Sequence, residues 1–180
     1  SSVGRLGWIE EYGFSPYEEE LVFDGEETYR TRFESIQEHG SREAWLDCAR
    51  AVRSGKTPGN VIARIVLAAS FASVLVGPCR CLPFFVHLWG GSETGKSLSL
   101  VLAASVWANP EIGVYIQTFN ATEVGKELGA AFCNSLPLII DELQLVKDNR
   151  KDFDRMIYQL SEGVGPVSYT HLRAHETLRH

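Results

Sequence analysis

The run from Gly90 to Ser97 has the residue types and the spacing that phosphate binding requires. It fills every fixed position of the pattern G-x-x-x-x-G-K-[ST]. In such a loop, backbone N–H groups at a helix N-terminus point at phosphate oxygens, Lys96 reaches the β- and γ-phosphates, and the Ser97 hydroxyl ligates Mg²⁺. The predicted nucleotide-binding residues are Gly90, Gly91, Ser92, Glu93, Thr94, Gly95, Lys96 and Ser97. A glycine- and serine-rich turn before an ordinary helix is the alternative interpretation.

The acidic pair Asp141-Glu142 is the second candidate group, and it follows the apolar run 136–140. A carboxylate at the C-terminal end of a parallel strand lies on the sheet edge where open α/β folds bind ligands. Asp141 is therefore predicted to hold Mg²⁺ through water. Glu142 is predicted to polarise the attacking water, which makes Lys96 and Glu142 the candidate catalytic residues. Taken alone, the run also fits a buried strand that meets a charged turn.

The elements that must position these residues alternate along the chain. The apolar run 84–89 predicts a buried strand before the loop, and residues 97–107 predict a helix after it. Residues 113–119 predict a strand, 120–133 a helix that begins at Asn120, and 136–140 the strand before the acidic pair. Alternation of this kind indicates a parallel sheet with helices on its faces. The predicted fold class is α/β, of the P-loop NTPase type.

The residues before this core, 1–80, are predicted to form a helical and partly β region. A small β-rich element is expected within residues 1–35, followed by an amphipathic helix over 41–54 with Ser41 as its cap. Residues 61–76 are largely apolar, but the run is shorter than a membrane span and is interrupted by Arg64. It is therefore predicted to be a buried helix that starts at Thr57-Pro58.

The end of the chain is predicted not to be native protein. Residues 167–177 back-translate to a sequence that resembles a transposon-based sequencing adapter, and 178–180 would then be index sequence. The histidines in this tail, His171, His175 and His180, are assigned no function. The chain also begins with Ser1, so a domain truncated at both ends is expected, with the P-loop core over 81–166. Another amphipathic helix is predicted at 151–162.

Composition favours a soluble, cytoplasmic protein. Hydrophobic residues make up 44% and charged residues 22% of the chain, and the net charge is −6. An acidic domain lacks the positive surface of a stand-alone nucleic-acid binder. The four cysteines show no paired metal spacing and are predicted to be buried free thiols; they are Cys48, Cys79, Cys81 and Cys133.

Several separate motifs resemble one family, the domain of unknown function numbered 927. The resemblance is carried by residues 82–110 around the glycine-rich loop, by 118–122, by 136–144 and by Tyr158-Gln159-Leu160 with Gly163 and Gly165. Members are similar to helicase-like ATPases of phages, plasmids and other mobile elements, often joined to a primase-like module. The resemblance implies a motor that uses ATP and Mg²⁺ and acts on DNA during replication in a bacterial host. A homo-oligomer is the expected assembly.

In P-loop ATPases that have a glutamate directly after the strand-ending aspartate, the sheet usually contains one more strand. That strand lies between the strand before the phosphate loop and the strand that ends in the aspartate, which is Asp141 here, and it carries a polar sensor residue. In this chain it would follow Gly165, as would an arginine finger. Two unpaired strand edges and an exposed apolar face are therefore expected.

Two other functions fit parts of the sequence. One is a regulatory module that binds nucleotide without turnover, and the intact set Lys96, Ser97, Asp141 and Glu142 argues against it. The other is a P-loop kinase, a class that usually shows a lid with several arginines. The charged run 147–152 is mixed in sign and fits a solvated loop instead. The sequence thus favours an ATP-hydrolysing, helicase-like domain.

Overall fold

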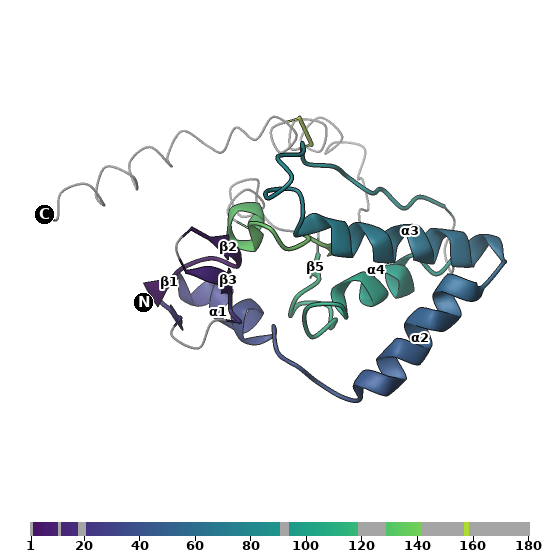
Figure 1. The fold of residues 1–180 in the computed structure, drawn as a ribbon, viewed down its shortest axis with the longest axis horizontal. Helices are drawn as coiled ribbons and strands as arrows, with labels where there is room; N and C mark the ends of the chain where they lie inside the picture. Colours follow the sequence, from purple (N-terminus) through teal and green to yellow (C-terminus); the bar gives the residue numbers. More distant parts are fainter. Residues whose placement is uncertain are drawn as a thin grey trace, which may run out of the picture.

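A computed structural model describes residues 2–10, 12–17, 21–90, 94–118, 129–141 and 157–158. It shows a mixed fold of helices and short strands (Figure 1). The elements are β1 (Ser2–Val3), β2 (Gly7–Ile9), β3 (Gly13–Ser15), β4 (Val22–Phe23), α1 (Glu27–Glu34), α2 (Arg42–Ser54), α3 (Pro58–Ser73), α4 (Lys96–Ala104), β5 (Gln117–Thr118) and β6 (Ile140–Asp141). Residues 129–133 are helical as well.

The N-terminal residues form two small sheets, which confirms the predicted β-rich element. Strand β1 pairs with β4 in parallel, and β2 pairs with β3 as an antiparallel hairpin. Helix α1 follows directly and was not expected from the sequence. It has no side-chain N-cap, and its aromatic residues Tyr29 and Phe33 pack against the core, so tertiary contacts contribute to its stability.

The hairpin is tied to residues very distant in sequence. The Leu6 N–H donates to the Phe132 carbonyl at 2.8 Å. The Asn134 side-chain amide donates to the carbonyls of Leu6 and Trp8, each at 2.9 Å. The Trp8 N–H donates to the Ser135 hydroxyl at 3.2 Å. These hydrogen bonds join the first strands of the chain to residues 132–135.

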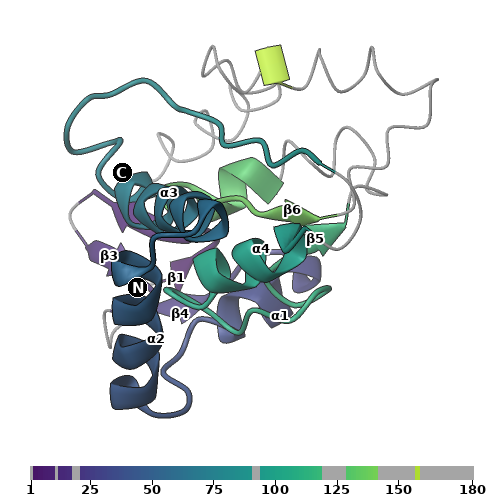
Figure 2. The same ribbon diagram turned by 90° about the vertical axis from the view of Figure 1, so that its right-hand side faces the viewer.

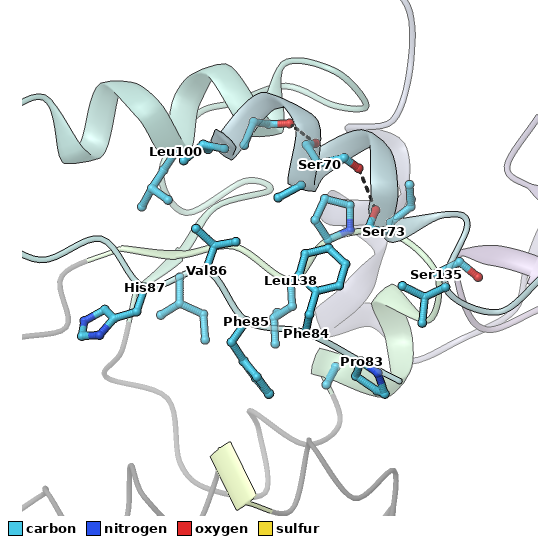
Figure 3. Close-up of a pocket in the computed structure, with 18 of the residues that line it drawn as sticks. Ser70, Ser73, Pro83, Phe84, Phe85, Val86, His87, Leu100, Ser135 and Leu138 are labelled. Carbon is cyan, nitrogen blue, oxygen red and sulfur yellow. Dashed lines mark hydrogen bonds between the residues drawn. The ribbon is translucent and has the colours of Figure 1, made fainter. Parts of the chain in front are cut away.

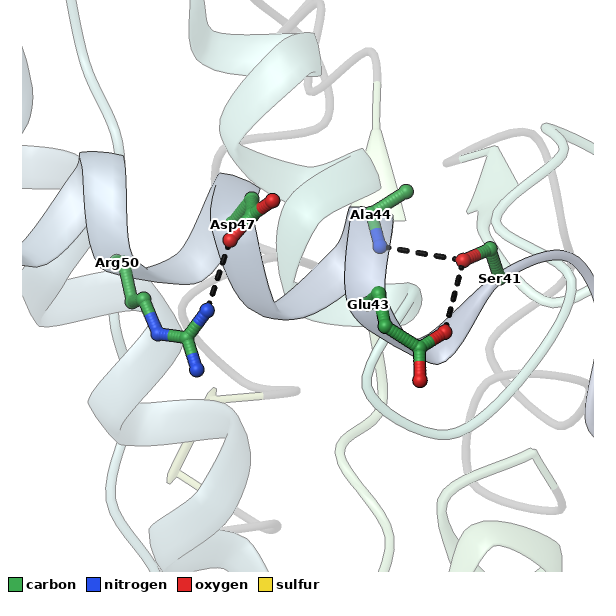
Figure 4. A network of polar contacts seen from close by, with 5 residues as sticks. All are labelled: Ser41, Glu43, Ala44, Asp47 and Arg50. Carbon is green, nitrogen blue, oxygen red and sulfur yellow. Dashed lines mark hydrogen bonds and ion pairs between the residues drawn. The ribbon is translucent and has the colours of Figure 1, made fainter.

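Helix α2 begins at the predicted cap. The Ala44 N–H donates to the Ser41 hydroxyl at 3.3 Å, which satisfies one of the donors that a helix start leaves open (Figure 4). The Ser41 hydroxyl in turn donates to Glu43 at 3.1 Å, and Arg50 pairs with Asp47 at 2.8 Å. This helix therefore follows its local sequence signals.

Helix α3 also begins as predicted, but it is not a buried helix. The Asn60 N–H donates to the Thr57 hydroxyl at 3.4 Å, and proline occupies the first turn. Val66 and Leu67 are buried, whereas Ile62 and Ile65 are exposed. The prediction was wrong because α3 packs against α2 and α4 and leaves the remaining side of its apolar surface uncovered by the described residues.

Strands β5 and β6 lie within the segments predicted as strands and pair in parallel, as expected of a parallel sheet. Gln117 lies opposite Ile140, and Thr118 lies opposite Asp141. The regular pairing is shorter than the predicted strands. Helix α4 packs against both β6 and α3, and Figure 2 shows it beside the two strands.

The buried core joins the N-terminal region to the second half of the chain. Its members are Leu6, Phe23, Ile36, Val66, Ala103, Ala104, Ala108, Tyr115, Ile116, Phe132, Cys133, Leu136 and Ile139. The burial of Ala103 and Ala104 shows that α4 turns small residues inward. Leu98, in the first turn of α4, is 73% exposed. The small side chains allow α4 to approach α3 closely.

Two further predictions were wrong. Residues 84–89 form no strand, and Phe84, Phe85 and Val86 are 48%, 44% and 43% exposed. A strand requires a partner for its backbone N–H and C=O groups, and no strand of the described part pairs with this segment. Among the cysteines only Cys133 is buried, while the other three are exposed free thiols.

Candidate nucleotide-binding site

The glycine-rich loop has the backbone that its glycines predict. Gly95 is the N-cap residue of α4 and has a φ of 78°, and Gly90 has a φ of 148°. L-residues rarely adopt either value. A Cβ at Gly95 would meet nothing within 4 Å. Glycine is therefore favoured there by the backbone conformation and not by crowding.

Lys96 folds back over this loop. It is the first residue of α4, and its ammonium group donates to the Gly90 carbonyl at 3.0 Å and to the Thr94 hydroxyl at 3.3 Å. The two hydrogen bonds draw the start and the end of the loop around one positive charge. The same charge lies at the N-terminus of a helix, where backbone N–H groups and the helix dipole favour an anion.

Buried polar contacts hold α4 in place near its other end. The Ser70 hydroxyl of α3 donates to the Ala103 carbonyl at 2.7 Å and accepts from the Trp107 indole N–H at 3.1 Å. The Trp45 indole N–H of α2 donates to the Ser105 hydroxyl at 3.0 Å. Sequence reasoning missed Ser70, although one serine on the inner side of an apolar helix was the available signal.

Asp141 lies at the C-terminal end of β6, and it is half-buried. Because α4 packs against β6, the helix that begins at Lys96 and the strand that ends at Asp141 are neighbours. Ser97 is exposed in the first turn of that helix. Gly91, Ser92, Glu93 and Glu142 lie outside the described residues.

An apolar cavity lies beside these elements (Figure 3). Its volume is about 440 Å³, and its walls come from residues 83–88, from α3 and α4, and from residues 134–138. Ser70, Ser73, His87 and Ser135 are among the polar residues that line it, and neither Lys96 nor Asp141 does. This cavity is therefore separate from the predicted phosphate site.

Within the described ranges, no three His, Cys, Asp or Glu side chains gather as a group that could hold a metal ion. None of the helices described is both long and apolar enough to cross a membrane.

A glycine-rich loop at the start of a helix, next to a parallel strand pair, defines a mixed α/β protein with a candidate phosphate-binding loop. The chain belongs to the family described as domain of unknown function (DUF927), which matches residues 2–168. This confirms the resemblance drawn from the sequence motifs. Searches of curated proteins and of solved structures gave no significant match.

Proposed function

We propose that this domain binds and hydrolyses ATP as a P-loop NTPase. The observation that carries the proposal is the geometry of one helix start. Gly95 takes a left-handed conformation at the cap of α4, Lys96 follows with its ammonium turned onto the loop, and the helix packs against the strand that ends in Asp141. A cation, open N–H groups and a neighbouring carboxylate are the parts that a Mg²⁺-nucleotide site combines.

The residues present fit such a ligand. Gly90 and Gly95 leave both ends of the loop without a side chain, and Lys96 with the first N–H groups of α4 would hold the phosphates. Ser97 and Asp141 offer the oxygen ligands that Mg²⁺ prefers. When bound, the ion neutralises charge on the phosphate oxygens. Glu142 is the proposed general base.

Binding would exchange one set of hydrogen bonds for a stronger one. In this structure Lys96 donates to the Gly90 carbonyl and to the Thr94 hydroxyl. Hydrogen bonds that involve a charged group are roughly twice as strong as those between neutral groups, so a phosphate would be a stronger acceptor for the ammonium than either of these.

The wider role rests on the family resemblance. We propose that the ATPase drives a helicase-like motor on DNA during replication of a phage or other mobile element, as a homo-oligomer in the bacterial cytoplasm and with a primase-like module as a possible partner. The acidic composition, with a net charge of −6, favours DNA contacts supplied by other subunits or domains.

The test compares ATP binding and ATP turnover, with and without single-stranded DNA, for the wild type and three variants. Lys96→Ala removes the cation of the loop, and we expect turnover to fall by about 10²-fold or more. Glu142→Gln should bind ATP but lose turnover. Lys56→Ala, which removes an exposed lysine before α3, is the matched control and should behave as the wild type.

Each result has a distinct meaning. Turnover that single-stranded DNA stimulates, and that both site variants lose, would support the motor. Tight ATP binding without turnover in the wild type would refute the motor and favour a nucleotide-dependent switch. ATP binding that Lys96→Ala leaves intact would refute the site itself.

A further inference from the structure

Arg32 of α1 occupies an unusual place between the N-terminal region and the parallel strand pair. Its guanidinium carbon lies 5.7 Å from the centroid of the Tyr29 ring and 5.8 Å from that of the Phe132 ring. Stacking of this kind holds a guanidinium plane in a fixed orientation. The side chain is half-buried, so its charge is partly removed from water.

The guanidinium meets the side chain of Gln117 in β5. With the amide oriented so that both groups are satisfied, the Gln117 oxygen accepts from the two Nη atoms at 2.8 and 3.0 Å. The paired donors fix the direction of the glutamine side chain as well as its distance. Arg32 of α1 therefore holds β5 through Gln117, and the next residue of β5, Thr118, lies opposite Asp141 of β6.

The surroundings leave this pair of side chains little room to move. A Cβ at Gly129 would lie 3.3 Å from the nearest atom of the Gln117 side-chain amide and 3.8 Å from an Arg32 Nη atom. Cys133 is buried beside them, and the nearby guanidinium lowers the pKa of its thiol while burial, the larger effect, raises it to about 11. Packing and charge both place Arg32 firmly against β5 and residues 129–133.

The arginine also carries a cost that stability alone does not explain. Its Nε atom is buried and has no hydrogen-bond partner among the described residues. An unsatisfied buried donor costs about 1–3 kcal/mol, and an apolar side chain of similar size would avoid that cost. The forked contact with Gln117 is what an apolar residue could not provide.

We infer that Arg32 is a positioning residue for the metal site: by gripping Gln117 it fixes β5 against β6 and holds Asp141 where Mg²⁺ binds. This inference rests on the proposed ATPase function. It also links the N-terminal region to the nucleotide site, since a displacement of α1 would reach β5, the strand that pairs with the metal-binding strand β6, through a single pair of side chains. Groups that hydrogen-bond metal ligands commonly change metal affinity 10- to 100-fold, and because Arg32 acts through β5 we expect an effect at the lower end of that range.

Arg32→Met and Gln117→Met are the test variants, and Arg30→Met is the matched control. Arg30 lies on the same helix but pairs with Glu27 and Glu34 of that helix and lies over the Phe23 ring. We expect the Mg²⁺ concentration for half-maximal ATP turnover to rise about 10-fold in either test variant, with no further rise in the double variant. Arg30→Met should change it less than 2-fold.

Amide hydrogen exchange gives a readout that does not depend on turnover. The Gln117 N–H donates to the Ile139 carbonyl at 2.9 Å, so its exchange reports on the pairing of β5 with its neighbour. Arg32→Met should speed exchange at residues 117–118 and 140–141 and leave α4 unchanged. Arg32→Lys keeps the charge but loses the forked contact, and it should resemble Arg32→Met.

The outcomes separate this inference from the proposed function. An active wild type with unchanged Mg²⁺ dependence in folded Arg32→Met and Gln117→Met would overturn the role of Arg32 alone. A wild type that binds no Mg²⁺-ATP would overturn the proposed function and the metal role together. In that case the hydrogen-exchange data would still show whether Arg32 holds β5 in place. Equal exchange rates at residues 117–118 and 140–141 in Arg32→Met and the wild type would refute that structural role as well.

Discussion

Two aromatic regions of this protein differ in what covers them. The N-terminal cluster, which comprises Leu6, Phe23, Tyr29, Phe33 and Phe132, lies in or against the buried core, with Phe132 3% exposed. The segment 82–89 is equally apolar, yet Leu82 and Trp89 are 83% and 86% exposed. Hydrophobic character is the same in both, so burial here depends on neighbouring elements and not on residue type.

The difference follows from whether the backbone N–H and C=O groups of each region have hydrogen-bond partners in strands or helices. In the N-terminal cluster, Phe23 lies in a paired strand, Tyr29, Phe33 and Phe132 lie in helices, and the Leu6 N–H donates to the Phe132 carbonyl. The segment 82–89 pairs with no described strand and borders a cavity of about 440 Å³. The phosphate loop begins where this open segment ends and continues into α4, which is well packed at its far end.

Truncation of one phenylalanine in each region gives the largest expected contrast. Phe132→Ala removes a buried ring that stacks on Tyr29 at 4.7 Å, and we expect the free energy of unfolding to fall by about 3–5 kcal/mol. Phe85→Ala, in the open segment, should cost about 1 kcal/mol or less. Urea denaturation measures both. Equal losses would mean that the open segment is covered in solution, and the comparison would fail.

Removal of the Ser70 hydroxyl tests the packing behind the loop. Ser70→Ala leaves the Ala103 carbonyl without its donor, and we expect a loss of about 1–2 kcal/mol in the free energy of unfolding. Ser73→Ala is the control, because the Ser73 hydroxyl donates only to the Ser70 carbonyl of its own helix in the described contacts. If the two variants lost the same stability, the Ser70–Ala103 hydrogen bond between α3 and α4 would contribute no more than a hydrogen bond within α3.

The smallest expected effect is a pH dependence of the free energy of unfolding, which arises from Cys133, next to Phe132 of the N-terminal cluster. Burial raises the pKa of the Cys133 thiol from 9.0 to about 11. The unfolded thiol therefore releases its proton first, so stability is complete below pH 9 and declines as the pH rises towards 11. The loss should be about 1 kcal/mol between pH 9 and 10.

Burial also raises the pKa of Tyr115, which adds a decline of the same sign above pH 10. Urea titrations of Cys133→Ala should show a flatter profile between pH 9 and 10 than the wild type. Cys48→Ala, which alters an exposed thiol, should keep the wild-type slope. A wild-type stability that is constant over this range would contradict the assigned burial of Cys133.

Local signals predicted the parts of the fold that depend on neighbouring residues. Ser41 and Thr57 cap α2 and α3 as expected, and Gly95 adopts the left-handed conformation that the loop pattern implies. The alternation of strands and helices predicted that paired strands would be parallel, as β5 and β6 are. Each of these features is decided within a few residues or by a strong periodic pattern.

Features that depend on distant partners could not be predicted. Residues 84–89 have the composition of a strand, but composition does not state whether a partner strand is present. Arg32 carries no motif, and its importance follows from Gln117 and Phe132, which lie far along the chain. The roles of Lys96, Ser97, Asp141 and Glu142 remain predictions that the proposed experiments would test.

The hydrogen bonds from the hairpin to residues 132–135 also bear on how the protein is made. Asn134 reaches Leu6 across 128 positions of sequence. At translation rates of about 5–20 residues per second, the first strands leave the ribosome roughly 6–26 s before their partners do. During that interval the hairpin lacks the partners at residues 132–135 that hydrogen-bond to it in the folded protein. Slow codons upstream of Phe132 would prolong that interval.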